Sequence, residues 1–162
     1  MGPGEVPGDD RIHDDVFPEI KPVIQGLSHI TLIVADLDQT AAFLARVFDA
    51  KEVYRSGAKQ FSLAKEAFFL IGGIWLCAME GRPSPGNNYS HIAFSTTKED
   101  LVLYRTRLEA ARVSLLPSRP RAAGEGDSLY FYDPDGYLYE LHDGSLKERL
   151  LAYKADGNPG TD

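Results

Sequence analysis

The chain has 162 residues, of which 43% are hydrophobic and 25% charged, a composition typical of a folded globular protein. Its formal net charge of −7 argues against nucleic-acid binding, and its longest mostly apolar run, over 67–79, is too short to span a membrane. The single cysteine, Cys77, excludes an internal disulfide and favours a reducing compartment, which we expect to be the cytoplasm.

Both ends of the chain are predicted to lie outside the folded body. Residues 1–23 combine seven glycines and prolines with six acidic and two basic residues, so we expect a disordered acidic tail. Residues 156–162 have a similar composition and are predicted to form a second disordered tail. The folded domain is therefore predicted over 24–155.

The first half of this domain predicts a strand, a helix and further strands. Alternating apolar residues indicate a strand over 27–35, and Asp36 or Asp38 can cap a helix of about 39–48. Further strands are expected near 51–56, 60–63 and 67–79.

The second half repeats this order. A strand is expected over 89–95, a helix of about 98–111 after the capping residue Thr97, and a short strand near 113–116. Strands over 128–133 and 137–142 flank a hairpin turn at 133–136. A final helix of about 145–154 is predicted to direct Leu146, Leu150 and Leu151 inward.

An internal repeat supports a two-module fold. The tripeptide Ser-His-Ile occurs at 28–30 and again 62 residues later, each time at the start of a predicted strand. We therefore predict an α+β fold of two βαβββ modules, about 26–81 and 88–146, followed by the C-terminal helix. Two such modules would enclose a cavity, a natural place for a shared metal site.

Three side chains are candidate metal ligands. His29 and His91 occupy equivalent positions of the two repeats, and Glu140 shares a strand face with Leu138 and His142. A carboxylate among apolar neighbours needs a partner or a metal ion. Two imidazoles and one carboxylate suit a divalent first-row ion and leave coordination positions open, although two ordinary core histidines remain the alternative.

Several segments resemble one known superfamily. The segments at 26–37 (GLSHITLIVADL), 87–94 (NNYSHIAF) and 119–146 (RPRAAGEGDSLYFYDPDGYLYELHDGSL) resemble the vicinal-oxygen-chelate (glyoxalase/bleomycin-resistance) superfamily. Within it, the chain resembles the fosfomycin-resistance proteins, most closely their FosX-type epoxide-hydrolase branch. This resemblance implies that His29, His91 and Glu140 hold Mn²⁺ or another divalent ion. It also implies a homodimer with shared sites, in which the first histidine comes from one subunit and the other two ligands from its partner.

The resemblance further implies the reaction, hydrolysis of the fosfomycin epoxide to a diol, which confers resistance. Glu66 matches the general base that activates water, whereas its local sequence beside Lys65 would predict an exposed turn carboxylate. The substrate is a small phosphonate, and the positions expected to bind it are Thr31, Trp75, Ser128, Tyr130 and Arg149, with Arg119 and Arg121 as additional cations.

Other functions of the same fold stay open. Asp127 and the turn at 133–136 are nearer to the thiol-transferring branch, so a glutathione or bacillithiol transferase is one alternative. A metal-free drug-binding protein is another, and an enzyme acting on a different epoxide or phosphonate is a third. The expected partners are a small-molecule phosphonate epoxide and, as the resemblance implies, a second copy of the chain, with no nucleic acid and no membrane.

Overall fold

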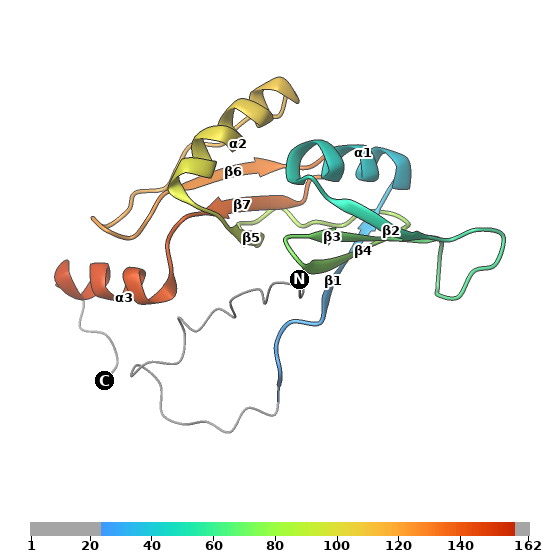
Figure 1. Ribbon diagram of the computed structural model, residues 1–162, viewed down its shortest axis with the longest axis horizontal. Coiled ribbons are helices and arrows are strands. Elements are labelled where there is room, and N and C mark those ends of the chain that lie inside the picture. The colour runs from blue at the N-terminus through green and yellow to red at the C-terminus, as the bar shows by residue number, and fades with distance from the viewer. Residues whose placement is uncertain (1–23, 158–162) are drawn as a thin grey trace, which may run out of the picture.

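The computed structural model describes residues 24–157, which form two sheets. The first sheet comes from the N-terminal half of the chain. Its strands are β1 (His29–Val34), β2 (Lys51–Arg55), β3 (Glu66–Ile71) and β4 (Ile74–Glu80), in the order β1-β4-β3-β2 (Figure 1). Strand β1 runs parallel to β4, and the other pairs are antiparallel. The predicted strand 67–79 is divided in two by Gly72 and Gly73, whose φ angles of 53° and 83° form a tight turn.

The second sheet comes from the C-terminal half. Its strands are β5 (His91–Ser95), β6 (Ser128–Tyr132) and β7 (Leu138–His142), in the order β5-β7-β6, with β5 parallel to β7. The strand predicted near 113–116 is reduced to a single bridge between Leu115 and Phe131. Pro117 and Pro120 follow at once and lack the N–H groups that a longer ladder needs.

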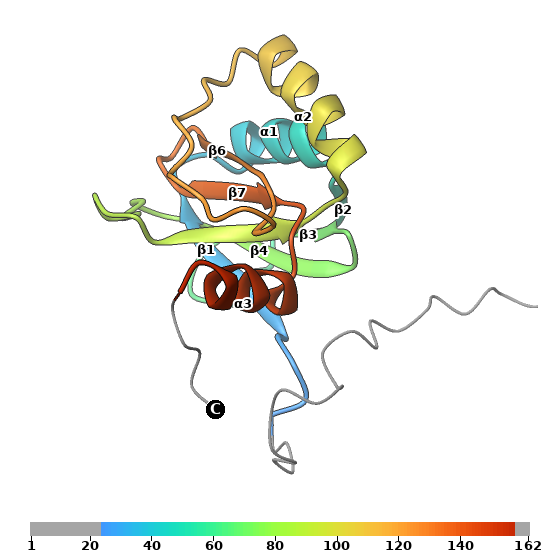
Figure 2. The same ribbon diagram turned by 90° about the vertical axis from the view of Figure 1, so that its left-hand side faces the viewer.

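Within residues 24–157, three helices accompany the sheets. Helix α1 (Leu37–Phe48) is capped by Asp36, and α2 (Lys98–Ala110) is capped by Thr97. Both lie on one side of the sheets, whereas α3 (Leu146–Ala155) lies on the opposite side (Figures 1 and 2). The mixed α+β class predicted from the sequence is confirmed.

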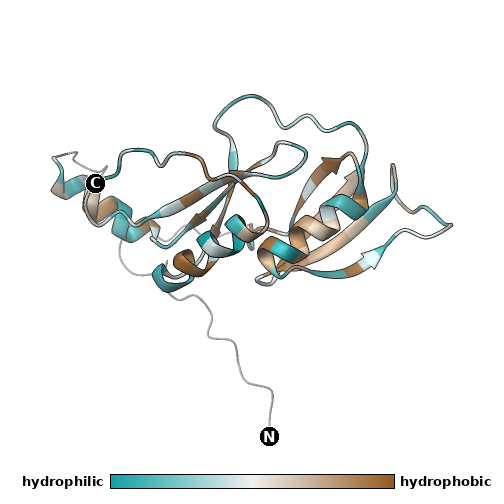
Figure 3. Cartoon of the chain, turned by 90° about the horizontal axis from the view of Figure 1, so that it is seen from above, coloured by the Kyte–Doolittle hydropathy of each residue, from teal (hydrophilic) through white to brown (hydrophobic). Residues whose placement is uncertain are grey.

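The core joins both sheets to α1. The ring of Phe48, at the end of α1, lies 5.2 Å from that of Phe94, 5.8 Å from that of Phe131 and 5.4 Å from that of Tyr139. These three partners belong to the second sheet, so the two halves of the chain share one hydrophobic core. Hydrophobic residues gather in the strands and helices, while the connecting loops are mostly hydrophilic (Figure 3).

Two expectations for apolar residues are wrong. No strand forms at 60–63, where Phe61 and Leu63 are 71% and 91% exposed, because the segment has no neighbouring strand to pair with. In α3, Leu146 and Leu151 are more than half exposed, whereas Leu150 is partly buried and Ala152 is buried. This helix contacts the rest of the chain through polar side chains, among them Arg149 and Tyr153.

The predicted tail 1–23 and residues 158–162 of the second predicted tail lie outside the described residues. Between residues 24 and 157, no helix is long and apolar enough to cross a membrane.

Candidate active site

The second sheet brings His91 and Glu140 into contact. Residues Ala93 and Glu140 are paired in register, which places His91 and Glu140 on the same face of neighbouring strands. His91 Nε2 lies 2.8 Å from Glu140 Oε2, and His91 Nδ1 lies 2.7 Å from the carbonyl oxygen of Tyr89. Because a carbonyl can only accept, we assign a proton to Nδ1, so Nε2 is the nitrogen available for a metal ion.

Other side chains of the same face surround Glu140, which is 3% exposed. Its Oε1 accepts hydrogen bonds from the hydroxyl of Ser128, from Tyr130 Oη at 2.8 Å and from Arg121 Nη2 at 3.4 Å. Burial opposes ionisation of Glu140, but the hydrogen bonds from Ser128 and Tyr130 and the adjacent histidines lower its pKa overall. The carboxylate is therefore held ionised, as a metal ligand must be.

Tyr130 is held in its neutral form. Burial, together with its neighbours Tyr89 and Glu140, raises the pKa of Tyr130 to about 12. Its hydroxyl therefore remains a hydrogen-bond donor throughout the physiological pH range.

The first sheet carries the third predicted ligand. In β1, the ring of His29 lies against that of Trp75, tilted by 31° with 4.3 Å between the ring centroids, and His29 faces outward from the chain, as does Thr31 two residues later. Within residues 24–157, no three His, Cys, Asp or Glu side chains form a group that could hold a metal ion. A single chain thus brings together His91 and Glu140 but leaves His29 on a separate sheet.

Glu66 shares the sheet face of His29. Register pairs His29 with Trp75, Thr31 with Cys77, and Glu66 with Met79, so all these side chains point to the same side. Glu66 is 7% exposed, and its Oε2 lies 3.6 Å from the Cys77 sulfur. The interpretation of Glu66 as an exposed turn carboxylate, which its local sequence suggests, is therefore wrong. Burial and the neighbouring carboxylate raise the pKa of Cys77 to about 11, which keeps the thiol protonated as a donor to Glu66.

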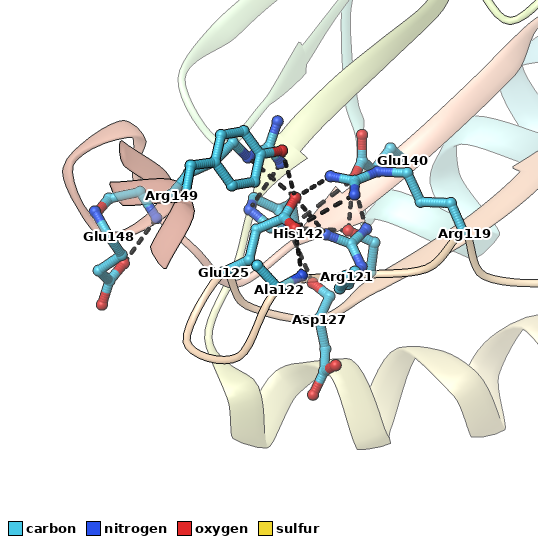
Figure 4. Close-up of polar contacts among 12 residues, drawn as sticks. Arg119, Arg121, Ala122, Glu125, Asp127, Glu140, His142, Glu148 and Arg149 are labelled. Carbon is cyan, nitrogen blue, oxygen red and sulfur yellow. Dashed lines mark hydrogen bonds and ion pairs between the residues drawn. The ribbon is translucent and has the colours of Figure 1, made fainter. Parts of the chain in front are cut away.

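The three predicted arginines converge on a residue that the sequence analysis did not single out. Glu125 has no exposed surface, and its carboxylate accepts from the guanidinium of Arg119 through both oxygens (Figure 4). Its Oε1 also lies 3.5 Å from Arg121 Nη1 and 3.4 Å from Arg149 Nε. Hydrogen bonds from Arg119 lower the pKa of Glu125 to about 2 despite its burial. The sequence signal available was an acidic residue between Gly124 and Gly126 that closely follows two arginines.

These arginines also reach the face of Glu140. Besides its contact with Glu140, Arg121 Nη2 lies 3.2 Å from Tyr130 Oη, and Arg149 Nη2 lies 3.3 Å from His142 Nε2. His142, a second residue that the sequence analysis did not propose for the site, lies with its Nδ1 2.8 Å from Ser128 Oγ. The guanidinium groups of Arg121 and Arg149 thus lie beside the carboxylate and the imidazoles of the second sheet.

The arrangement defines a known class of domain. The chain belongs to the Glyoxalase/Bleomycin resistance protein/Dioxygenase superfamily, whose sequence profile matches residues 26–141. Within this superfamily it is similar to the fosfomycin resistance protein FosX of Listeria monocytogenes, with 52% identity over 131 residues that cover 81% of this chain and 98% of that one. The metallothiol transferase FosB of Bacillus licheniformis is more distant, at 38% identity over 81% of this chain and 83% of its own.

A solved structure supports the same placement. A variant of the Listeria monocytogenes FosX, crystallised with Mn(II) and 1S,2S-dihydroxypropylphosphonic acid, superimposes with a TM-score of 0.72. It is 51% identical and covers 80% of this chain and 98% of its own. The resemblance to FosX-type proteins noted from the sequence is therefore confirmed, and with it the fold.

Proposed function

We propose that this chain hydrolyses the epoxide ring of fosfomycin to a diol, in a Mn²⁺-dependent reaction that confers fosfomycin resistance. The observation that carries the proposal is the buried Glu66 on the same sheet face as His29 and Thr31, which supplies a candidate general base on the face of a predicted metal ligand. The dihydroxypropylphosphonic acid bound to the Listeria protein is the compound expected from adding water to an epoxypropylphosphonate.

The donor set fits a divalent ion. His91 and Glu140 already face one another at 2.8 Å with the second imidazole nitrogen held by a carbonyl, and His29 presents a further imidazole on an exposed face. When bound, Mn²⁺ supplies Lewis-acid stabilisation of the negative charge that develops on the epoxide oxygen.

We propose that a second copy of the chain completes this site. The strand faces that carry His29 and His91 are both exposed in one chain, and the two imidazoles lie on different sheets. A homodimer in which the first sheet of one copy covers the second sheet of the other would bring His29 to His91 and Glu140. The lone cysteine of the chain agrees with a cytoplasmic location for this dimer.

Mixed dimers test this sharing of the site. Variants His29→Ala and Glu140→Ala should each be inactive, yet a mixture of the two that is allowed to exchange subunits should recover about a quarter of wild-type activity. The recovery is expected because each mixed dimer contains one intact site and one site lacking both ligands. If each chain carried a complete site of its own, the mixture would stay inactive, and the shared arrangement would be refuted.

The chain's own groups account for the proton and the substrate. Glu66 accepts the proton of a water molecule, whose oxygen bonds to an epoxide carbon as the bond from that carbon to the ring oxygen breaks. The ring oxygen stays on the neighbouring carbon and takes a proton from solvent to become the second hydroxyl, and Glu66 returns its own proton to solvent. We propose that Ser128, Tyr130 and Thr31 contact the substrate, that Trp75 closes the pocket beside His29, and that Arg119, Arg121 and Arg149 attract the phosphonate.

Replacing Glu66 with Gln tests the hydrolase. The amide keeps the size of the side chain but cannot take a proton, so diol formation should fall about 10²–10⁴-fold while Mn²⁺ affinity is unchanged. The assay follows fosfomycin by phosphorus NMR with Mn²⁺ and no thiol, and Mn²⁺ binding by electron paramagnetic resonance. Glu80→Gln, an exposed carboxylate at the end of β4, is the matched control and should retain full activity. Undiminished hydrolysis by Glu66→Gln would refute the assignment of the base.

The same assay separates the alternatives. A sulfur-containing product that forms only with glutathione or bacillithiol would place the chain with the thiol transferases, and Glu66 would then have no role in catalysis. Binding of fosfomycin to metal-stripped protein as tightly as to the Mn²⁺ form would instead support a metal-free drug-binding protein.

A further inference from the structure

Glu125 joins the three arginines from two separate parts of the chain. Arg119 and Arg121 belong to the segment before β6, whereas Arg149 lies in α3, and all three reach Glu125 Oε1. Tyr153, one turn after Arg149, donates to the same oxygen at 3.1 Å, and the backbone N–H of Ala122 donates to Oε2 at 3.1 Å. Each carboxylate oxygen of Glu125 is therefore occupied by donors of this chain.

We propose that Glu125 is the positioning residue that directs the guanidinium groups of Arg119, Arg121 and Arg149 toward the anionic group of the substrate. This inference rests on the proposed function, because it assumes that a phosphonate binds beside Glu140. Glu125 itself touches neither the substrate nor the metal ligands and acts only through the arginines.

The guanidinium of Arg121 shows how this positioning works. One of its terminal nitrogens, Nη1, faces Glu125, and the other, Nη2, faces Tyr130 and Glu140. Because a guanidinium is planar and rigid, fixing one nitrogen fixes the direction of the other. Nε of Arg121 is buried without a hydrogen-bond partner among the residues that the structure describes, which leaves a donor for an incoming anion.

The backbone that carries Glu125 is itself fixed by close packing. Gly126 has a φ of 92°, and a Cβ atom there would lie 2.8 Å from backbone atoms of Gly144. A Cβ on Gly144 would in turn collide with the carbonyl oxygen of Glu125. The carboxylate thus extends from a loop with little room to shift, as a rigid anchor for three long side chains requires.

Two roles for Glu125 predict opposite effects on anion binding. Three arginines face two carboxylates here, those of Glu125 and Glu140. If Glu125 only neutralised charge, its removal would make the site more positive and strengthen the binding of a phosphonate. If it positions the arginines, its removal lets them separate by mutual repulsion and weakens that binding.

The test measures the affinity of Mn²⁺-loaded, full-length protein for methylphosphonate by titration calorimetry. We expect Glu125→Gln to raise the dissociation constant about tenfold or more, and Glu125→Asp, which keeps the charge but shortens the side chain, to raise it as well. Asp127→Asn is the matched control. The Asp127 carboxylate lies in the same loop, points away from the arginines in Figure 4 and makes no side-chain hydrogen bond or ion pair among the described residues. The affinity of the Asp127→Asn variant for methylphosphonate should therefore stay within about twofold of that of the wild type. Tighter or unchanged binding by Glu125→Gln would overturn the proposal.

A second readout does not depend on the ligand. In the wild type, the Nε–H protons of the three arginines should give ordered, slowly exchanging NMR signals, which should broaden or shift in Glu125→Gln and remain unchanged in Asp127→Asn. If Glu125→Gln fails to fold, as judged by circular dichroism, Glu125→Asp and Tyr153→Phe decide the question in the same two assays. Failure of the wild type to bind methylphosphonate would count against the proposed function, whereas unchanged arginine signals in the variants would refute the positioning role alone.

Discussion

Asp133 gives the hairpin between β6 and β7 a pH-dependent stability. Its carboxylate is 9% exposed and accepts hydrogen bonds from the backbone N–H groups of Asp135 and Tyr137 at 3.0 and 2.9 Å and from the Tyr139 hydroxyl at 3.4 Å. Burial, against the effect of the backbone hydrogen bonds, raises its pKa from 3.8 to about 6. The folded state therefore holds this proton more tightly than the unfolded state, and the stability that Asp133 contributes at low pH is lost as the pH rises from about 4 through about 6.

Replacing Asp133 with Asn should remove this dependence. The shift corresponds to a total of about 3 kcal/mol, of which about 2 kcal/mol falls between about pH 4 and about pH 7.5. The amide oxygen can keep both backbone hydrogen bonds, so the free energy of unfolding of Asp133→Asn, minus that of the wild type, should rise by about 2 kcal/mol over this interval. Urea unfolding of both proteins at a series of pH values measures the difference. A pH-independent difference for Asp133→Asn would refute the raised pKa.

Three further substitutions test the packing that supports the site. Phe48→Ala should lower the free energy of unfolding by about 3–5 kcal/mol, because the ring fills the core between α1 and the second sheet. Thermal unfolding measures this loss of stability. A loss no larger than that caused by Leu103→Ala, at an exposed leucine, would contradict the prediction. Gly144→Ala should lower the free energy of unfolding by about 1–3 kcal/mol and raise the KM for fosfomycin, since the new methyl group displaces Glu125. A rise in KM without a loss of stability would argue against this clash. Ser145→Ala removes the N-cap of α3 and should cost about 1 kcal/mol by chemical denaturation, whereas Ser145→Asp, which can cap equally well, should retain the stability.

Local patterns in the sequence predicted most of the elements correctly. The caps at Asp36 and Thr97 and the turn at 133–136 are all set by short-range hydrogen bonds, which the sequence displays directly. The strand expected at 60–63 failed because alternation records only which residues are apolar, whereas a strand also needs a neighbour to pair with. The inward leucines expected in α3 failed for a related reason, because the burial of Leu146 and Leu151 depends on what packs against the helix.

The site was predictable only where it repeats or resembles a known pattern. The recurrence of Ser-His-Ile identified the two histidines, and alternation placed Glu140 beside His142 and Ser128 beside Tyr130 on common faces. Glu125 has no such signal. Its importance arises from long side chains that converge from α3 and from the loop before β6, and sequence spacing does not reveal a convergence of that kind.

The pairing of β6 with β7 has a consequence for how this protein can change over evolution. Ser128 lies opposite His142, and Tyr130 opposite Glu140, so every polar side chain of this face depends on one register set by the turn at its far end. Substitutions in the turn can be tolerated, but inserting or deleting a single residue there would turn Glu140 into the core and Tyr139 out of it. Length variation among descendants of this chain should therefore collect in the segment 57–65 and leave the hairpin at constant length.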